Sequence, residues 1–367
     1  MKRGHFDKTL MLLIALLVTG GCMLFASAAF GLLARGSTGM SSVVFNHLVL
    51  GVGLGLVALL AFAFIDYRRL RPYALYIFIA ALIGTAAVFI PHVGFSHGGG
   101  RRWISIFHLT LQPSEGLKLA TILMAAAYFS SMRKQVESLA YGFGGFAAIM
   151  AGPILILVAQ PDLGTLGVIC FSVSAIFFAA GASWKQVVAA ILIGVISLTL
   201  LALWRPYVRD RITTFFDPSK GQQSQAYQIK QSLIAVGSGG FAGRGLGQGI
   251  QKFTYLPEPM GDSIFAVAGE EMGFIGTVTI VLLFIAFALR GYSIGTRSQD
   301  MFGSLLAIGL STYLASEAFI NIAAMLGVAP LTGIPLTFMS QGGSAMLASL
   351  AGAGVLLNIS RQQKKRA

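Results

Sequence analysis

The chain is poor in charged residues, in acidic residues above all, and nearly free of cysteine. Charged residues make up 11% of its 367 positions, whereas about 25% is usual in a soluble domain. Its two cysteines, Cys22 and Cys170, fall inside apolar runs, where we expect them to pack as small hydrophobic residues. The sequence contains neither a P-loop motif nor a His/Cys spacing typical of a metal site. These absences exclude an ordinary soluble domain and give no sign of a P-loop enzyme or a zinc-binding module.

Apolar sequence is abundant instead. Hydrophobic residues make up 56% of the chain, and its mean hydropathy is +0.78. A helix needs about 20 apolar residues to cross a bilayer. The basic start followed by an apolar run is typical of a signal peptide, but the run continues to Leu33, so we expect a retained first helix. We predict an all-α, polytopic membrane protein forming one transmembrane domain over residues 1–367, with about ten spans near residues 9–33, 44–65, 73–91, 115–131, 140–159, 163–181, 186–204, 263–289, 301–326 and 342–359.

Lysine and arginine predict the orientation of these spans. The net charge is +13, and basic residues gather at both ends of the chain and in alternate short loops. Short cytoplasmic loops carry an excess of such residues, so ten spans place both termini in the cytoplasm. Nucleic-acid binding, which a strongly basic soluble protein would suggest, is disfavoured here. Anionic membrane lipids are the expected partners of these charges.

The opposite face of the membrane keeps four connections, near residues 92–114, 159–164, 205–262 and 327–341. The third is a large extracytoplasmic loop, and loops of that length are usually functional or disordered. Within it Ile229, Leu233 and Val236 recur at near-helical spacing. This pattern predicts an amphipathic helix that lies on the membrane surface.

The first connection contains RRWISI, in which Arg101 and Arg102 precede Trp103. A guanidinium matches phosphate geometry in a bidentate way, so the two arginines are candidate phosphate ligands. The alternative is that the segment anchors the chain at the membrane boundary, where tryptophan is common.

Two further ionisable groups lie at the starts of predicted spans. Lys118 is one turn inside the fourth span, on the same face as Glu115. A charge at that depth normally has a partner or a function, and the alternative is a lysine that snorkels to the surface. Asp162, in QPDLGT, either caps the sixth span or contributes to a site.

Glycine and proline distinguish the last two connections. Seven glycines fall within residues 237–249, around Arg244. Backbone can approach a ligand closely at glycine, although a flexible hinge has the same signature. Pro330 and Pro335 break the helix near the end of the chain, which is tolerated at membrane depth only inside protein or beside a cavity. We expect the backbone amides and hydroxyls after this break to contact a head group, and the residues that provide them are Ser340, Gly342, Gly343 and Ser344.

Four acidic residues open the eighth predicted span, namely Glu258, Asp262, Glu270 and Glu271. Asp262 falls at the first turn, where the helix dipole stabilises a carboxylate. It is either a helix cap or a general base at the rim of an outward cavity. Glu270 and Glu271 lie deeper, and with Glu317 we expect them to make structural polar contacts or to line the cavity. The residues alone indicate an outward-open site for an amphiphile with an anionic head group.

Several stretches occur in the order found in the SEDS family of bacterial cell-wall proteins, the FtsW/RodA group: RRWISI, QPSEGLKL, QPDLGT, GRGLGQGIQKFTYLPEP, DSIFAVAGEEMGFIG and NIAAMLGVAPLTGIPLTFMSQGGS. The chain resembles this family over almost its whole length, and it looks closer to FtsW, the division member, than to RodA, the elongation member. It departs from the family where Gly261 and Ser263 flank the aspartate in place of Thr and Phe. Thr337 and Gln341 likewise replace Pro and Tyr. These departures concern the fine geometry of the site rather than the aspartate.

The resemblance implies that the chain polymerises peptidoglycan glycan strands from lipid II, with Asp262 in the position of the family's essential aspartate. On this hypothesis Asp262 deprotonates the acceptor 4-hydroxyl, which displaces undecaprenyl diphosphate from the donor with inversion. Lys118 is the expected partner of Asp262. The groups expected to stabilise the leaving group are Arg101, Arg102, Lys118 and Arg244. A divalent cation such as Mg²⁺ or Mn²⁺ is a further candidate, although the sequence contains no dedicated ligand set.

The resemblance also implies a place in the bacterial cytoplasmic membrane and a partner. That partner is a single-pass class B penicillin-binding protein, a transpeptidase, and other division or elongation proteins would regulate the pair. Two rival functions stay open: a lipid II flippase, which needs a path to the cytoplasmic side, and a non-catalytic scaffold that activates the transpeptidase. A carboxylate at the outer rim favours the polymerase over the flippase.

Overall fold

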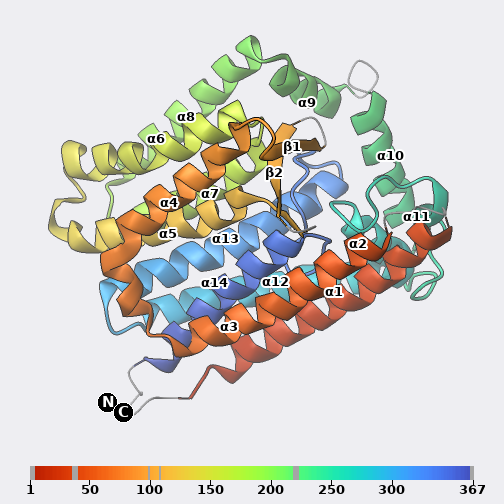
Figure 1. The fold of residues 1–367 in the computed structure, drawn as a ribbon, viewed down its shortest axis with the longest axis horizontal. Coiled ribbons are helices and arrows are strands. Elements are labelled where there is room, and N and C mark those ends of the chain that lie inside the picture. The colour runs from red at the N-terminus through yellow and green to blue at the C-terminus, as the bar shows by residue number, and fades with distance from the viewer. Residues whose placement is uncertain (1–4, 35–39, 98–99, 107–108, 218–222, 364–367) are drawn as a thin grey trace.

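The computed structural model describes residues 5–34, 40–97, 100–106, 109–217 and 223–363, and long helices that run side by side dominate it (Figure 1). Within these residues, the helical segments long and apolar enough to cross a membrane are Lys8–Gly31, Val43–Phe64, Tyr67–Phe89, Leu139–Ala159, Trp184–Trp204, Ile264–Thr296, Met301–Met325 and Gly343–Arg361. Two further helices match predicted spans. One, Leu163–Ala179, is apolar but shorter, and the other, Pro113–Ser131, carries Glu115 and Lys118. The prediction of an all-α polytopic membrane protein is confirmed.

Several passes are built from more than one helical segment. The helical elements in chain order are α1 (Lys8–Ala34), α2 (Met40–Phe45), the π-helical η1 (Asn46–Gly53), α3 (Leu54–Phe64), the 3₁₀ segment η2 (Tyr67–Tyr73), α4 (Ala74–Ala86), η3 (Ala87–Phe89), α5 (Pro113–Ser131), η4 (Arg133–Gln135), η5 (Leu139–Phe143), α6 (Gly144–Ala159), α7 (Leu163–Ala179), α8 (Trp184–Trp204), α9 (Pro206–Phe216), α10 (Gln223–Ser238), α11 (Gln251–Thr254), α12 (Ile264–Thr296), α13 (Met301–Met325) and α14 (Gly343–Arg361). Single π-type turns inside helices are often found at functional sites. Here η1 brings Asn46 and His47 to the cavity described below.

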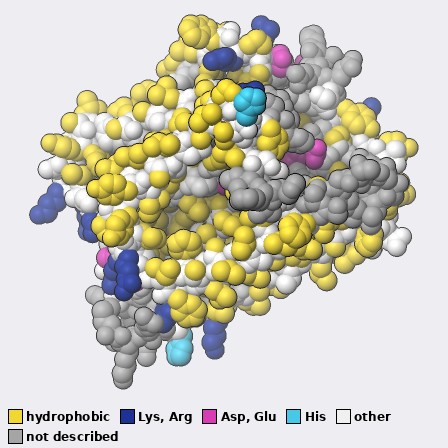
Figure 2. All heavy atoms as spheres, viewed as in Figure 1, with side chains coloured by type: hydrophobic (Ala, Val, Ile, Leu, Met, Phe, Trp, Pro, Cys, Tyr) yellow, Lys and Arg dark blue, Asp and Glu magenta, His cyan; other side chains and the backbone are white. Residues whose placement is uncertain are grey.

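The core lies around α13 and α14. In the most apolar stretch of each helix, 72% of the residues of α13 and 89% of those of α14 are buried, whereas none of those of α8 are. Small residues allow this packing, since a Cβ on Gly354 of α14 would lie 2.4 Å from the Leu59 carbonyl oxygen. By contrast, α8 carries large aliphatic side chains on all its faces, as expected of a helix surrounded by lipid. Figure 2 shows hydrophobic side chains over most of the visible face.

One end of the bundle, here called the terminal end, is closed by polar contacts between the start of α1 and neighbouring helices. Arg290 of α12 forms an ion pair with Asp7, with 2.5 Å between Nη2 and Oδ2. The Asp7 backbone N–H also donates to Ser360 Oγ of α14. Arg68 pairs with Asp300 at 3.1 Å. The described ends of the chain therefore meet at the terminal end (Figure 1).

The first long connection forms a small antiparallel sheet, which was not predicted from the sequence. Its strands are β1 (Gly94–His97), β2 (Gly100–Ile106) and β3 (Leu109–Leu111), in the order β1-β2-β3. Phe95 lies opposite Trp103, and Ile104 lies opposite Leu111. The sheet lies at the other end of the bundle, here called the cavity end, and fixes Arg102 and Trp103 on β2.

The large connection between α8 and α12 holds α9, α10 and α11. The helix predicted around Ile229 is confirmed as α10, but it packs against α12 and α13 of the bundle, with Ser232 and Ala235 fully buried, instead of resting on the membrane surface alone. It therefore contributes a wall to the cavity end (Figure 1).

The glycine-rich stretch that follows α10 packs against α12. The Arg244 and Gly245 N–H groups donate to the backbone carbonyls of Glu270 and Glu271, both at 3.0 Å. Gly273 interrupts α12 with φ +63°, and the Phe274 N–H donates to Gly240 instead. A Cβ on Gly243 would lie 2.2 Å from the Glu271 carbonyl oxygen. These glycines permit close approach to a helix, and neither a ligand contact nor a hinge is needed to explain them.

Candidate active site

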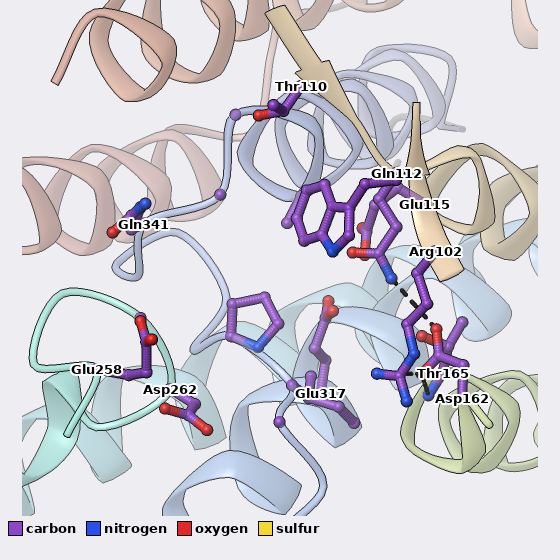
Figure 3. Close-up of a pocket in the computed structure, with 18 of the residues that line it drawn as sticks. Arg102, Thr110, Gln112, Glu115, Asp162, Thr165, Glu258, Asp262, Glu317 and Gln341 are labelled. Carbon is purple, nitrogen blue, oxygen red and sulfur yellow. Dashed lines mark hydrogen bonds and ion pairs between the residues drawn. The ribbon is translucent and has the colours of Figure 1, made fainter. Parts of the chain in front are cut away.

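A cavity of about 730 Å³ opens at the cavity end. Its wall is formed by α2, η1, the small sheet, the starts of α5 and α7, the helices α9 and α10, the loop before α12, Glu317 of α13, and residues 331–345. This volume falls within the range of roughly 300–1,000 Å³ that is usual for ligand pockets. The acidic side chains at its wall come from four separate segments: Glu115, Asp162, Glu258, Asp262 and Glu317 (Figure 3).

Asp262 is held on the cavity wall by contacts to two helices. Gln228 of α10 donates a hydrogen bond from Nε2 to Asp262 Oδ1 at 3.0 Å and another to Ser263 Oγ at 3.1 Å. Asn321 of α13 donates from Nδ2 to the Asp262 carbonyl oxygen at 2.8 Å. The carboxylate is partly exposed and lines the cavity. Its side chain therefore does not face lipid, and it is not the cap of α12, because the N-cap position is Ser263 and no side-chain cap bond is made there.

The surroundings of Asp262 suit a base. Burial among protein groups raises the pKa of the Asp262 carboxyl to about 6. The Gln228 hydrogen bond opposes this rise in pKa, nearby Glu258 adds to it, and Arg211 opposes it. A general base is most effective when its pKa lies near the working pH, so this carboxylate is suited to take a proton from a hydroxyl.

Arg102 reaches the same cavity from β2. Its Nε donates to the Gln160 carbonyl oxygen at 3.2 Å, its Nη2 donates to the Pro161 carbonyl oxygen, and Nη1 lies 3.7 Å from Asp162 Oδ1. Asp162 accepts a hydrogen bond from the Thr165 N–H and so caps α7, which confirms the first of its two predicted roles. The same carboxylate also holds Arg102 in place (Figure 3).

Arg211 of α9 is a second guanidinium in the cavity, and it was not among the site residues predicted from the sequence. It donates from Nη1 to the Thr332 carbonyl oxygen at 3.2 Å and lies 4.9 Å from the centre of the Tyr207 ring. Its Nε is buried without a hydrogen-bond partner among the described residues. The signal in the sequence was the excess of cations in the large loop, which does not by itself distinguish one arginine from another.

Lys118 does not pair with Asp262, so that prediction is wrong. Its Nζ lies 2.5 Å from Glu317 Oε1 and 2.9 Å from Glu115 Oε2, and it sits 5.0 Å from the centre of the Tyr313 ring. The lysine is 1% exposed, so it does not snorkel either. Glu115 and Glu317 face the cavity, and Lys118 lies behind them as their shared counter-ion.

The other predicted contacts divide between the cavity and its surroundings. Trp103, Gly342 and Gly343 line the cavity. Arg101 is exposed on β2 and does not line it. Ser340 and Ser344 do not line the cavity. Their hydroxyls accept backbone bonds instead: the Leu336 N–H donates to Ser340 Oγ at 2.7 Å, and the Gln112 N–H donates to Ser344 Oγ at 3.2 Å.

Arg244 and the deeper glutamates belong to a separate polar cluster. Arg244 Nε lies 3.7 Å from Glu270 Oε1, and Lys252 Nζ lies 2.6 Å from Glu271 Oε1. None of these residues lines the cavity, so the prediction that Arg244 faces a head group is wrong. Of the predicted alternatives for Glu270 and Glu271, structural contacts are the correct one.

The donor groups do not fit a resident metal ion. In the part of the chain that the structure describes, no group of three or more His, Cys, Asp or Glu side chains is placed to hold one. The positive groups at the cavity wall are Arg102 and Arg211.

Fold and site define a polytopic α-helical membrane protein with a polar cavity at one end, in which carboxylates face two guanidinium groups. The chain belongs to the FtsW/RodA/SpoVE family of cell cycle proteins, whose family pattern matches residues 7–365.

Relatives of known name are similar over most of the chain. The chain is 37% identical to stage V sporulation protein E of Bacillus subtilis over 363 residues, which is 99% of each protein. It is 36% identical to a probable peptidoglycan glycosyltransferase FtsW of Geobacter metallireducens, over 85% of this chain and 83% of the relative.

Solved structures share the fold. One, from a study of a peptidoglycan synthase complex that coordinates polymerization and crosslinking, superposes with a TM-score of 0.77 at 26% identity, covering 98% of this chain and 99% of that one. The rod shape determining protein RodA of Thermus thermophilus superposes with a TM-score of 0.70 at 25% identity, over 98% of each chain.

Proposed function

We propose that the chain is a peptidoglycan glycosyltransferase that polymerises lipid II into glycan strands, with Asp262 as the general base. The observation that carries the proposal is that Asp262 shares one cavity with Arg102 and Arg211. A base for a sugar hydroxyl and two cations for a diphosphate are the groups that this reaction needs. Membership of the FtsW/RodA/SpoVE family and relatives named as glycosyltransferases support the same reaction.

The reaction is a direct displacement. Asp262 removes the proton from the 4-hydroxyl of the acceptor sugar while that oxygen forms a bond to the anomeric carbon of the donor. The bond from that carbon to the diphosphate oxygen breaks, and undecaprenyl diphosphate leaves with the electron pair. Attack opposite the leaving group turns an α-linked donor into a β-glycosidic product. The proton ends on Asp262, whose pKa of about 6 allows it to be lost again near neutral pH.

Arg102 and Arg211 stabilise the leaving group in this account. Guanidinium groups bind phosphate oxygens in a bidentate way. Arg102 is oriented by Asp162 and the carbonyls of the α6–α7 turn, so it is held in place before the substrate arrives. Arg211 lines the same cavity, which places a second guanidinium beside a bound diphosphate. Trp103, Gly342 and Gly343 provide the remaining proposed contacts to the head group.

The donor diphosphate is neutralised by arginine in this proposal. A divalent cation that arrives with the diphosphate stays a prediction from the resemblance, and no step is assigned to it.

We further propose that the cavity end faces outward in the bacterial cytoplasmic membrane and that both termini are cytoplasmic. Basic residues at the terminal end, such as Arg68 of η2 and Arg290 near the end of α12, support this orientation. The acceptor strand and the donor head group then both lie on the outer side of the membrane, where the cavity opens.

A penicillin-binding transpeptidase of class B is the proposed partner. The similarity to a chain from a peptidoglycan synthase complex that coordinates polymerization and crosslinking supports this pairing. Other division or elongation proteins would act on the pair.

The structure of the cavity floor favours the polymerase over a flippase. Glu115 and Glu317 on the cavity wall form a buried ion cluster with Lys118 behind them, and each of the three is at most 3% exposed. A head group crossing the membrane by this route would have to separate these ions.

The test is to reconstitute the chain with its partner and lipid II and to measure glycan polymer and lipid II transport separately. Polymer without transport supports the proposal. Transport without polymer supports a flippase, and the absence of both activities supports a scaffold.

A further inference from the structure

Glu258 occupies a strained backbone position in the turn that presents Asp262. Its φ is +44°, in the left-handed region that residues other than glycine rarely adopt, and a proline stands on each side of it. The Glu258 carbonyl oxygen accepts the N–H groups of Gly261 at 3.0 Å and of Ser263 at 3.2 Å, which closes the turn. Glycine would adopt this φ without strain. The turn itself therefore does not explain why the position carries a carboxylate.

The side chain of Glu258 faces the cavity beside Asp262. Both residues line the cavity, and Figure 3 shows the two carboxylates on the same stretch of wall. A Cβ added to Gly261 would lie 3.5 Å from Glu258 Oε2, so the carboxylate folds back over the backbone next to Asp262. Glu258 is exposed, and its side chain makes no ion pair or hydrogen bond with the residues that the structure describes. It has no structural contact to maintain.

Asp262 has charged neighbours on several elements. Its own loop contributes Glu258, α9 contributes Arg211, and the polar side chains of Gln228 and Asn321 come from α10 and α13. The remaining charged groups at the cavity wall are Arg102 on β2, Glu115 on α5, Asp162 before α7 and Glu317 on α13. Of the charged neighbours that act most strongly on Asp262, Glu258 favours its protonated form and Arg211 its ionised form.

We propose that Glu258 and Asp262 act as a coupled carboxylate pair, in which Asp262 takes the proton of the acceptor hydroxyl and Glu258 passes it on to solvent. This inference rests on the proposed glycosyltransferase function. The negative charge of Glu258 strengthens Asp262 as a base. When the new glycosidic bond has formed, the proton on Asp262 moves through water to Glu258 and from there to the outside. Asp262 is ionised again and ready for the next addition.

The test is the pH dependence of lipid II polymerisation by the full-length chain with its partner, comparing wild type with Glu258→Gln. Loss of the negative charge lowers the pKa of Asp262, so the acid limb of the rate profile moves to lower pH by on the order of one unit. Because the relay is lost, turnover near neutral pH falls roughly 10-fold. Glu258→Asp keeps the charge and retains most of the activity. Glu137→Gln, an exposed glutamate between η4 and η5, is the matched control and leaves the profile unchanged.

A further variant separates the side chain from the backbone. Glu258→Gly relieves the left-handed strain and removes the carboxylate, and it provides the same test if Glu258→Gln does not fold. We expect it to show the same shift in profile at a thermal stability no lower than that of wild type. Wild-type turnover and an unshifted acid limb in either variant would overturn the inference. The proposed function fails on a different result, namely no polymer from wild type or full activity in Asp262→Asn.

Discussion

Gln228 of α10 donates a 3.0 Å hydrogen bond from its Nε2 to Oδ1 of Asp262. The large connection between α8 and α12 therefore supplies a direct partner to the candidate base. The same connection contributes Arg211 through α9. Although it lies outside the membrane spans, this connection forms one wall of the cavity, and its Gln228 and Arg211 both oppose the rise in the pKa of Asp262 that burial causes.

The hydrogen bond from Gln228 predicts a pH effect of definite sign. Asp262 acts as a base only when ionised, so kcat/KM of wild type should fall as the pH drops through about 6, the pKa of this carboxyl. Gln228→Leu removes a bond that favours the ionised form, which raises the pKa further. Its acid limb should move to higher pH, opposite in direction to the shift expected for Glu258→Gln. An acid limb that stays at the wild-type position in Gln228→Leu would show that this bond does not tune the base.

The two cavity arginines predict a contrast with their neighbour. Replacing Arg102 or Arg211 by alanine should lower kcat for lipid II polymerisation by roughly 10–100-fold, because each removes a cation from the developing diphosphate charge. Arg101→Ala is the matched control, since Arg101 is next to Arg102 in sequence but exposed outside the cavity. Steady-state rates of the three variants in the same membranes decide the matter. Equal losses in Arg101→Ala and Arg102→Ala would contradict the assignment.

The buried ion cluster predicts a loss of stability. Lys118→Met leaves Glu115 and Glu317 without the cation that lies 2.9 and 2.5 Å from them. Breaking a buried pair by removing one partner costs about 3–5 kcal/mol, so the melting temperature of the purified protein should fall clearly. The triple variant Glu115→Gln, Lys118→Met, Glu317→Gln removes all three charges and should recover part of the loss. A melting temperature for Lys118→Met equal to that of wild type would rule out this account of the cluster.

The position of Arg244 outside the cavity predicts that it does not bind substrate. Its side chain is 38% exposed and pairs with Glu270 outside the cavity. Because Arg244 does not line the cavity, Arg244→Ala should leave both KM for lipid II and kcat within about twofold of wild type. A KM raised tenfold or more would return Arg244 to the substrate site.

The sequence predicted the helices well because the membrane imposes a strong constraint on them. Each of the ten predicted spans corresponds to a helix or a run of helical segments, since about 20 apolar residues in a row have few other structures available. The helix at Ile229 was likewise predicted by its spacing. The small sheet that carries Arg102 and Trp103 was missed, because its strands are short and their pairing depends on contacts across a turn.

The site was predicted only where one residue had a distinctive position. Asp262 was selected at the start of a span and lies on the cavity wall. Lys118 was assigned the wrong partner, because helical spacing identifies Glu115 but cannot reveal Glu317, which comes from a helix 199 residues further along the chain. Arg211 was missed for the same reason, since only the folded large connection brings α9 against the cavity.

The most direct test of the central claim is lipid II polymerisation by wild type and by Asp262→Asn in the same reconstituted membranes, with the partner present. The account predicts that wild type makes long glycan and that the variant, which keeps the shape of the side chain but cannot take a proton, is slower by roughly 10²–10⁴-fold. Its melting temperature should remain close to that of wild type. Polymer formed by Asp262→Asn at the wild-type rate would contradict the claim that this carboxylate is the base.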